Sequence, residues 1–322
     1  MLSEFDFIRR HFVRPSPGTR LGVGDDCALM QPTPGQELAV STDLLVAGRH
    51  FFEDVDPGRL GRKSAAVNLS DMAAMGALPR WVTLGLTLAR PDEVWTGAFA
   101  DGFYHELQAH GVDWVGGDTT AGPTTVVAVT ILGELPPGQA LRRSGAVVGD
   151  DVWVSGTPGD AALGLRMLQT SIVLADQDRR YCLDRLETPT PRVSLGLALR
   201  GLAHAAIDIS DGLLADLGHI LDASGVGACV EFDRIPRSPA LDRQQHLADW
   251  QMLALAGGDD YELCFTAAAQ DAPAIQQAAA RAQVQVSCIG RITAAAQERC
   301  VLDVRGQPLP VSWQGFDHFR TT

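Results

Sequence analysis

The chain has 322 residues, of which 46% are hydrophobic and 20% charged, and its formal net charge at pH 7 is −13. This length is too great for one compact core of ordinary size and predicts two domains in a folded protein. The acidic balance argues against a nucleic-acid partner, since no basic stripe is available to neutralise phosphates, and no apolar run reaches the length of a membrane span.

Strands and helices are expected to alternate through the first part of the chain. Strand patterns occur at 38–42, 81–89, 112–115 and 125–132, and helical patterns occur at 57–77 and 92–109. A proline-rich break at 135–138 is interpreted as a linker. It divides a domain of residues 1–137 from a domain of residues 138–322.

The second part of the chain repeats the alternation. Strands are expected at 151–155, 206–209, 227–232, 261–266 and 285–289. Helices are expected at 160–168, 192–203, 212–223, 247–256 and 272–283. The alternation predicts an α/β or α+β protein, and propensity alone leaves open whether its sheets are parallel.

Six short aspartate clusters, flanked by glycine or hydroxyl residues, stand out in a chain with one lysine, Lys63. They lie at 24–26, 41–43, 68–71, 116–118, 208–211 and 257–260. Carboxylates that converge in space repel one another and raise each other's pKa unless cations lie between them. Hard oxygen ligands suit Mg²⁺, which usually binds through one or two carboxylates plus substrate phosphates. The clusters therefore predict a site for several magnesium ions and a phosphate ligand, in which the cations invert the local field.

Each cluster alone also fits an ordinary structural role. Residues 41–43 are expected where a strand ends, so their oxygens can meet a ligand or form an N-cap or Asx-turn. Asn68 and Asp71 share a helical face, which fits metal ligation or plain solvated polarity. Asp211 can cap the helix that follows it or lie at an anion-binding helix N-terminus. The glycine pair at 116–117 permits close approach of a phosphate to the backbone.

Familiar phosphate-binding signatures do not occur in the sequence. The G-x-x-x-x-G-K-[ST] pattern of P-loop proteins is missing, as are the His-Arg-Asp and Asp-Phe-Gly strings of protein kinases. Residues 22–26 resemble a glycine-rich loop but also fit a plain turn. Any phosphoryl chemistry therefore requires a different architecture.

Three further residues have both a binding and a structural interpretation. Trp313 lies in a polar, near-terminal stretch, where its indole can stack on a ligand ring or pack the tail onto the body. His50 fits a ligand contact or a structural histidine. Arg143 can clamp a nucleotide phosphate or lie on the surface of the linker.

The cysteines and the amino terminus indicate a cytoplasmic protein. Six cysteines are scattered without CxxC spacing, which favours buried or inert thiols in a reducing compartment over zinc ligation or disulfides. The amino terminus has no apolar segment after a basic start, so no secretory signal is expected. We expect no membrane partner.

Taken in chain order, eight strings closely resemble the thiamine-monophosphate kinase family. They are GVGDDCAL (22–29), STDLLVAGRHF (41–51), AVNLSDMAAMGA (66–77), GGDTT (116–120), RSGAVVGD (143–150), DISDGLLADLGHI (208–220), GGDDYELCFT (257–266) and WQGFDHF (313–319). The wider superfamily includes aminoimidazole-ribonucleotide synthetase and selenophosphate synthetase. The resemblance implies a two-domain fold of the aminoimidazole-ribonucleotide synthetase type and ATP-dependent conversion of thiamine monophosphate to thiamine diphosphate.

The resemblance also implies an assembly and a division of labour between the domains. It implies a homodimer joined by the N-terminal sheets. Residues 1–137 would bind ATP and Mg²⁺ and dimerise, and residues 138–322 would form an α/β domain that completes the active site.

Carried over by position, the resemblance implies a set of ligands for each bound species. Several Mg²⁺ ions would be held by Asp26, Ser41, Thr42, Asp43, Asp71, Asp118, Asp208 and Asp211. ATP would be contacted by Gly117, Asp118, Arg143, Ser210 and His110, the last at a position where family members often carry Tyr. The thiamine phosphate would be contacted by His50, Asp259 and Trp313, and family members often carry Glu at the position of Asp259.

The implied reaction needs no general base, because a phosphate oxygen of the acceptor is already an anion at neutral pH. The obstacle is charge: two dianionic phosphates about 4 Å apart at an effective dielectric near 20 oppose each other by roughly 16 kcal/mol. Magnesium ions held by the aspartates would remove most of this repulsion and hold the oxygens in line. We expect direct transfer, since the carboxylates are better occupied as metal ligands than as nucleophiles.

Other functions remain to be distinguished. Selenophosphate synthetases would bring a reactive cysteine and a catalytic lysine near the amino terminus, and residues 1–20 contain neither. An aminoimidazole-ribonucleotide synthetase-like enzyme, a non-catalytic sensor of nucleotide or divalent cations, and a magnesium-dependent phosphatase are the alternatives.

Overall fold

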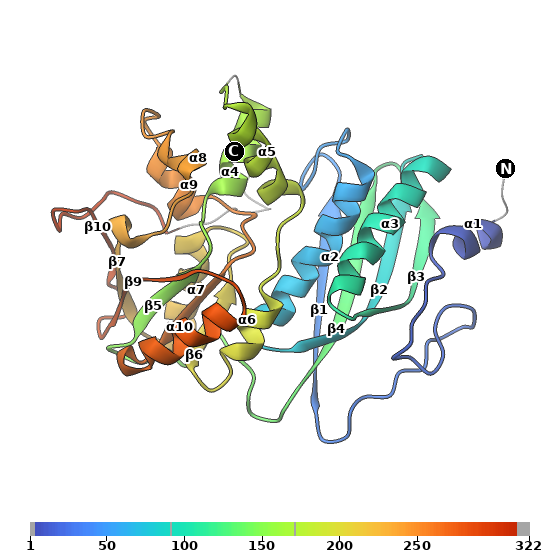
Figure 1. The fold of residues 1–322 in the computed structure, drawn as a ribbon, viewed down its shortest axis with the longest axis horizontal. Helices are drawn as coiled ribbons and strands as arrows, with labels where there is room; N and C mark the ends of the chain where they lie inside the picture. The colour runs from blue at the N-terminus through green and yellow to red at the C-terminus, as the bar shows by residue number, and fades with distance from the viewer. Residues whose placement is uncertain (1–3, 91, 171, 314–322) are drawn as a thin grey trace. The chain divides into compact units, whose positions relative to one another are not determined.

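A computed structural model describes residues 4–90, 92–170 and 172–313 of the chain (Figure 1). The chain forms two compact units. The first comprises Met1–Met72 and Ala77–Gly138, and the second comprises Ala73–Gly76 and Gln139–Thr322. Within the described ranges, no helix is both long and apolar enough to cross a bilayer.

The first unit is a four-stranded sheet with the strand order β1-β4-β2-β3. Its strands are β1 (Glu37–Val46), β2 (Leu78–Leu88), β3 (Asp113–Ala121) and β4 (Val126–Leu135). β4 pairs antiparallel with both β1 and β2, and β3 pairs parallel with β2. The sheet is therefore mixed, and β1 and β3 are its two edges.

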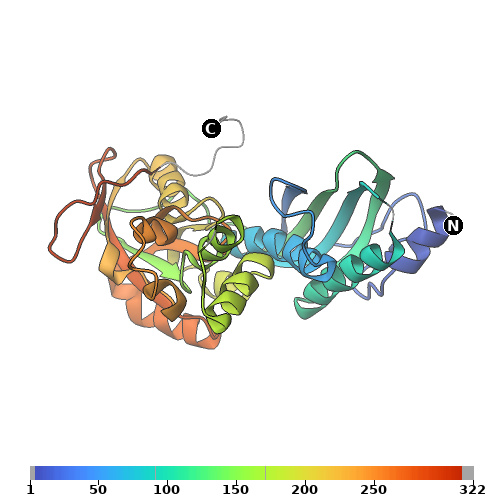
Figure 2. The same ribbon diagram turned by 90° about the horizontal axis from the view of Figure 1, so that it is seen from above.

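Helices α2 (Pro57–Ala74) and α3 (Glu93–Ala109) cover one face of this sheet (Figure 2). Helix α1 (Glu4–His11) packs beside α3. The core between helices and sheet contains large buried side chains, among them Leu69, Phe99, Phe103, Trp81 and Trp114. Burial of these apolar groups is the main stabilising term for the unit.

The opposite face of the sheet is open along β1. Leu38, Val40 and Leu44 are exposed, with 47%, 60% and 55% of their surface accessible. The prediction of a short buried strand at 38–42 is therefore wrong. The strand is longer, and apolar residues at alternate positions face away from the helices because only one face of the sheet is covered.

The second unit is a six-stranded sheet with the order β10-β7-β9-β5-β8-β6. Its strands are β5 (Asp151–Ser155), β6 (Ala203–Asp208), β7 (Gly227–Glu231), β8 (Leu263–Ala267), β9 (Val286–Thr293) and β10 (Arg299–Leu302). Only the β10–β7 pair is parallel. The predicted α/β or α+β class is confirmed, with one mixed sheet in each unit.

The helices of the second unit surround this sheet. They are α4 (Asp160–Gln169), α5 (Asp176–Glu187), α6 (Val193–Ala198), α7 (Leu213–Ser224), α8 (Pro239–Asp242), α9 (Trp250–Ala256) and α10 (Ala272–Arg281), with the 3-10 turns η1 (Phe232–Arg234) and η2 (Ala269–Asp271). α7 packs on β6 and β8, and α4 packs on α5 and α9. The helix expected at 192–203 is shorter, because β6 already begins at Ala203.

All six cysteines are free thiols. Cys182 and Cys264 are buried, which raises the pKa of both thiols, that of Cys182 to about 12. Cys27 is the exposed one of the six.

Candidate active site

The strand β1 and helix α2 bring Ser41 and Asp71 into contact. The Ser41 hydroxyl donates to Asp71 Oδ2 at 2.5 Å. Residues 41–43 lie in the middle of β1, so the prediction that they mark the end of a strand is wrong. The apolar run at 38–42, from which the strand was predicted, covers only the first half of β1.

The alternation of side chains along β1 separates Thr42 from its two neighbours. Asp43 shares the face of Ser41, two residues away, whereas Thr42 is directed to the opposite face. There its hydroxyl lies 2.8 Å from that of Thr130 on β4. The structure therefore brings together Ser41 and Asp71, with Asp43 on the same face, and does not add the Thr42 side chain.

Asn68 is part of the packing of α2 and not of a solvated face. It is buried, and its Nδ2 donates to Ser64 O at 3.0 Å. Its Oδ1 is buried and has no hydrogen-bond partner in the part of the chain that the structure describes. Asp71, one turn further along, is partly exposed and is the residue of this helix that can meet a ligand.

Gly117 and Asp118 lie within β3, so the loop expected at 116–118 is instead a continuous strand. Gly117 pairs with Leu84 of β2, and its φ is +154°. A Cβ at Gly117 would lie 1.9 Å from Leu84 O, which leaves room for glycine only. Asp118 is exposed at this edge of the sheet.

The register of the sheet places Asp43 and Gly117 at opposite edges. Asp43 pairs with Val129, Val129 with Leu84, and Leu84 with Gly117. Three inter-strand spacings of about 4.8 Å separate them by roughly 14 Å. Within one chain, Asp43 and Asp118 therefore belong to two different groups of side chains.

The loop that carries Asp26 lies near the β3 edge. Backbone hydrogen bonds between Leu21 and Leu29 close the loop, and Asp25 Oδ1 accepts from Asp26 N at 2.9 Å. Val23 of this loop lines a small pocket. The other residues around that pocket include Ile8, Phe12, Leu84, Trp114, Gly117 and Asp118. Asp26 is exposed in the same loop, three residues after Val23.

The two histidines of the first unit have defined local roles. His50 Nδ1 accepts from Val46 N at 3.0 Å, so the proton of the neutral ring is on Nε2. His110 caps the end of α3, with Nε2 3.7 Å from Glu106 Oε1. Burial alone would raise the pKa of Glu106, but the His110 hydrogen bond and the charge of Arg62 outweigh it and lower that pKa.

In the second unit, two segments that are distant in sequence are joined by backbone hydrogen bonds. Asp259 N donates to Ser210 O at 2.9 Å, and Tyr261 N donates to Ile209 O at 2.8 Å. Asp208 ends β6, one residue before the predicted end, and is buried. This pairing places Asp208, Ser210 and Asp211 beside Asp259, which is the second group of candidate ligands.

Asp216 organises the loop before α7 and was not identified from the sequence. Its Oδ2 accepts from the amides of Ser210, Asp211 and Gly212 at 3.0, 3.0 and 3.1 Å. These amides are thus occupied by the chain's own carboxylate, and they are not free to bind an anion. An acidic residue in the first turn of the expected helix was the available signal.

The environment of Asp216 also perturbs its ionisation. Burial, followed by the nearby charges of Asp208 and Asp211, raises the pKa of Asp216 to about 7, although the amides of Asp211 and Ser210 oppose the rise. Such like-charge crowding is what a bound cation would relieve.

Two non-glycine residues beside this loop have left-handed backbone. Asp259 has φ +66° and Tyr261 has φ +51°. Left-handed backbone of this kind costs roughly 1–3 kcal/mol per residue and persists where the surroundings impose it. The Tyr261 hydroxyl donates to Asp259 Oδ1 at 3.1 Å.

Arg143 lies on an exposed loop, whereas Trp313 packs against the core of the second unit. Arg143 is exposed on a loop that Ser224 fastens, since the Ser224 hydroxyl accepts from Gly145 N and Ala146 N. Trp313 is half-buried and packs, with Val311, against the core of the second unit. The packing interpretation of Trp313 is thus correct, and its buried Nε1 has no hydrogen-bond partner among the described residues. Residues 314–319 of the WQGFDHF string lie outside the described residues.

The donor set fits magnesium by its chemistry, since the candidates offer carboxylate and hydroxyl oxygens. Among the residues that the structure describes, no three His, Cys, Asp or Glu side chains form a group that could hold a metal ion. A site of this kind depends on substrate phosphates and water to complete the coordination, which is the usual behaviour of Mg²⁺.

Two family models match successive parts of the chain. Residues 24–135 match AIR synthase related protein, N-terminal domain, and residues 147–303 match AIR synthase related protein, C-terminal domain. A thiamine-monophosphate kinase of Salmonella typhimurium is 47% identical over 325 residues, covering 99% of this chain and 98% of the relative. The chain belongs to the thiamine-monophosphate kinase family.

Solved structures of this family have the same fold. The thiamine-monophosphate kinase of Stenotrophomonas maltophilia K279a is 46% identical, has a TM-score of 0.85, and covers 93% of this chain and 96% of its own. The structure named AaThiL complexed with AMPPCP and TMP is 28% identical, with a TM-score of 0.78 over 98% of this chain and 96% of its own. The expected two-domain architecture is confirmed by these matches.

Proposed function

We propose that this protein transfers the γ-phosphoryl group of ATP to thiamine monophosphate and forms thiamine diphosphate. The observation that carries this proposal is the 47% identity, over nearly the full length of both chains, with kinases that bear this name. The complex of a related structure with AMPPCP and TMP supports the same pair of substrates.

Mg²⁺ is the metal that the candidate ligands fit. One set of proposed ligands, Ser41, Asp43 and Asp71, belongs to β1 and α2, and Thr42 is left out of it because its side chain lies on the opposite face of β1. Asp118 on β3 and Asp26 in the loop before β1 are the other proposed ligands of the first unit. Asp208 and Asp211 form the set of the second unit. When bound, the ions would neutralise phosphate charge, which is the largest obstacle to the reaction.

We assign Gly117, Asp118, His110, Arg143 and Ser210 to the nucleotide. Gly117 lines the small pocket at the β3 edge together with Asp118, which supports its assignment. Arg143 is exposed and carries a permanent charge suited to phosphate oxygens. The assignment of His110 to ATP is the least direct of these, since its ring Nε2 already lies 3.7 Å from Glu106 Oε1.

We assign His50, Asp259 and Trp313 to the acceptor. His50 presents Nε2–H as a hydrogen-bond donor, which fits a phosphate oxygen. Asp259 is fixed by backbone and side-chain hydrogen bonds beside Ser210. The indole of Trp313 offers a face for a cationic ring, although one side of it packs on the protein.

In this account the protein binds and orients both substrates and moves no proton. The attacking oxygen of thiamine monophosphate is already ionised, so a general base is unnecessary. Rate enhancement comes from holding donor and acceptor in line and from charge compensation. No carboxylate acts as a nucleophile, and transfer is direct.

We further propose a homodimer that forms through the open face of the N-terminal sheet. The exposed side chains of Leu38, Val40 and Leu44 on β1 form an apolar stripe suited to a second copy. A second copy would also supply an Asp118 to the β1 edge, which lacks one in its own chain. In this scheme residues 1–137 dimerise and bind ATP and Mg²⁺, residues 138–322 complete the active site, and the reaction takes place in the cytoplasm.

An assay of ADP release with and without thiamine monophosphate tests the proposed function. The proposal expects ADP only when both Mg²⁺ and the acceptor are present, with thiamine diphosphate as the second product. Release without acceptor would indicate a phosphatase, and no release under any condition would indicate a sensor. ADP release with the substrate of aminoimidazole-ribonucleotide synthetases instead of thiamine monophosphate would indicate an enzyme of that kind. Each of these three results contradicts the proposal.

A further inference from the structure

The segment that leads into β8 is held in a conformation that its own residues disfavour. Asp259 and Tyr261 both have positive φ, and neither is glycine. Such backbone survives only where contacts around it fix it. The hydrogen bonds to Ile209 and Ser210 position one side of the segment, and the contacts of Glu262 position the other.

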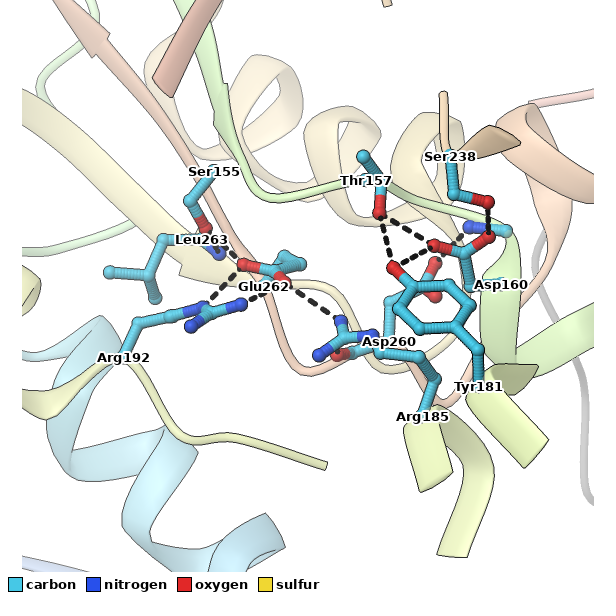
Figure 3. A network of polar contacts seen from close by, with 11 residues as sticks. Ser155, Thr157, Asp160, Tyr181, Arg185, Arg192, Ser238, Asp260, Glu262 and Leu263 are labelled. Carbon is cyan, nitrogen blue, oxygen red and sulfur yellow. Dashed lines mark hydrogen bonds and ion pairs between the residues drawn. The ribbon is translucent and has the colours of Figure 1, made fainter. Parts of the chain in front are cut away.

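Glu262 is a fully buried carboxylate between two arginines (Figure 3). Arg192 donates from Nε to Oε2 at 2.6 Å and from Nη2 to Oε1 at 2.5 Å. Arg185 Nη2 donates to Oε1 at 2.7 Å, and the Ser155 hydroxyl donates to Oε2 at 2.6 Å. A bidentate arginine pair of this kind is both strong and directional.

The charge state of Glu262 follows from these contacts. Burial alone would raise the pKa of its carboxyl, but the hydrogen bond and charge of Arg192, with the charge of Arg185, outweigh burial and lower it. Both Glu262 oxygens therefore accept hydrogen bonds as an anion. The side chain has no exposed surface, so it cannot itself touch a substrate.

Arg185 also holds the residues before Glu262. Arg185 Nη2 donates to Asp260 O at 3.1 Å, and Asp260 Oδ2 accepts from Gly159 N at 2.7 Å. A Cβ at Gly156 would lie 2.0 Å from Glu262 Oε1, so the loop before α4 closes tightly over the carboxylate. Residues 260–262 are thus fixed from α5, from the start of α6 and from the loop after β5.

We propose that Glu262, clamped by Arg185 and Arg192, is a positioning residue that sets the orientation of Asp259. The chain of contacts is short: Glu262 fixes the backbone of Tyr261, and the Tyr261 hydroxyl donates to the Asp259 carboxylate. Without the clamp, the left-handed residues relax to ordinary φ values and Asp259 leaves its place beside Ser210. The consequence for acceptor binding rests on the proposed function, in which Asp259 contacts thiamine monophosphate.

Hydrogen exchange tests the positioning directly and does not depend on any activity. In Glu262→Gln, the amides of Asp259 and Tyr261 should exchange about tenfold faster than in the wild type. The matched control is Asp178→Asn, which breaks another buried carboxylate–arginine pair of the same unit, that of Asp178 with Arg243. The control should leave those two amides unchanged. Equal exchange at both amides in folded Glu262→Gln and wild type would overturn the proposal.

Arg192→Lys is the milder variant, because it retains the positive charge and loses the bidentate geometry. It replaces Glu262→Gln in the exchange measurement if the latter does not fold. In steady-state kinetics, it should raise the KM for thiamine monophosphate by about tenfold while the KM for ATP stays within about threefold. An equal rise of both KM values would contradict the proposal that Glu262 and its arginines orient Asp259. A wild type without kinase activity would refute the proposed function alone, since the exchange result stands independently.

Discussion

Asp43 and Asp118 lie on the two edge strands of one four-stranded sheet, β1 and β3. Both belong to the set of proposed Mg²⁺ ligands, yet the sheet register holds them apart within a single chain. A site that uses both therefore calls for a second copy of the protein. This relationship leads to a complementation experiment.

Asp43→Asn and Asp118→Asn should each be inactive alone and regain activity when the two chains are co-expressed. If each site takes Asp43 from one subunit and Asp118 from the other, half of the sites in a mixed dimer carry no substitution. Random pairing then restores about a quarter of wild-type turnover. No recovery in isolated mixed dimers would place both aspartates in one subunit's site.

Gly117→Ala should be far more damaging than Gly116→Ala. A Cβ at Gly117 meets Leu84 O at 1.9 Å, whereas a Cβ at Gly116 meets nothing within 4 Å. We expect Gly117→Ala to lower the free energy of unfolding by roughly 2 kcal/mol or more and to weaken nucleotide binding. Denaturant unfolding and titration with an ATP analogue measure both. Similar behaviour of the two variants would contradict the close approach of β3 to β2.

The stability of the metal-free protein should depend on Asp216. Its folded-state pKa of about 7 lies above the ordinary value of 3.8, so the folded state binds the proton more tightly than the unfolded state. The resulting contribution to the free energy of unfolding is fully present below about pH 4 and is lost as the pH rises through 7. This contribution is roughly 4 kcal/mol at most.

Asp216→Asn removes this titrating group and keeps the shape of the side chain. Unfolding free energies in EDTA from pH 5 to 8 should fall more steeply for the wild type than for the variant. Parallel curves would show that Asp216 ionises normally.

Trp313→Ala should weaken acceptor binding more than ATP binding. The expected rise in the dissociation constant for thiamine monophosphate is about tenfold, from loss of an aromatic face. Val311→Ala is the control, because Val311 packs on the same core without an indole. It should lower stability slightly and leave both affinities unchanged. Equal losses for the two ligands in Trp313→Ala would leave the residue with a packing role only.

The parts of the fold that were predictable from sequence have strong local patterns. The apolar face of residues 57–77 predicted α2. The strand expected at 206–209 was found as β6, which begins three residues earlier, because apolar residues precede a polar turn there. Helix α5 was not predicted, since Asp176–Glu187 is rich in charge and shows little apolar periodicity. Yet this helix supplies Arg185, which holds Glu262.

The candidate site was predictable by residue type and less so by position. Aspartates beside glycines indicated phosphate and metal chemistry, and the pairing of Ser210 with Asp259 joins two of those clusters. The separation of Asp43 from Asp118 depends on strand order, which no local pattern encodes. The role of Asp216 depends on three amides that converge only after folding.

We expect carboxylates of this chain to take up Mg²⁺ together with the phosphates of the substrate. Calorimetric titration of Mg²⁺ into the protein with a non-hydrolysable ATP analogue measures this uptake directly, with Asp71→Asn as the comparison. We expect a heat of Mg²⁺ binding larger than that of Mg²⁺ binding to the analogue in the absence of protein. This additional heat should be strongly reduced in Asp71→Asn and nearly absent without nucleotide. Uptake that is equal in wild type and variant, or no uptake beyond that of the analogue, would contradict this expectation.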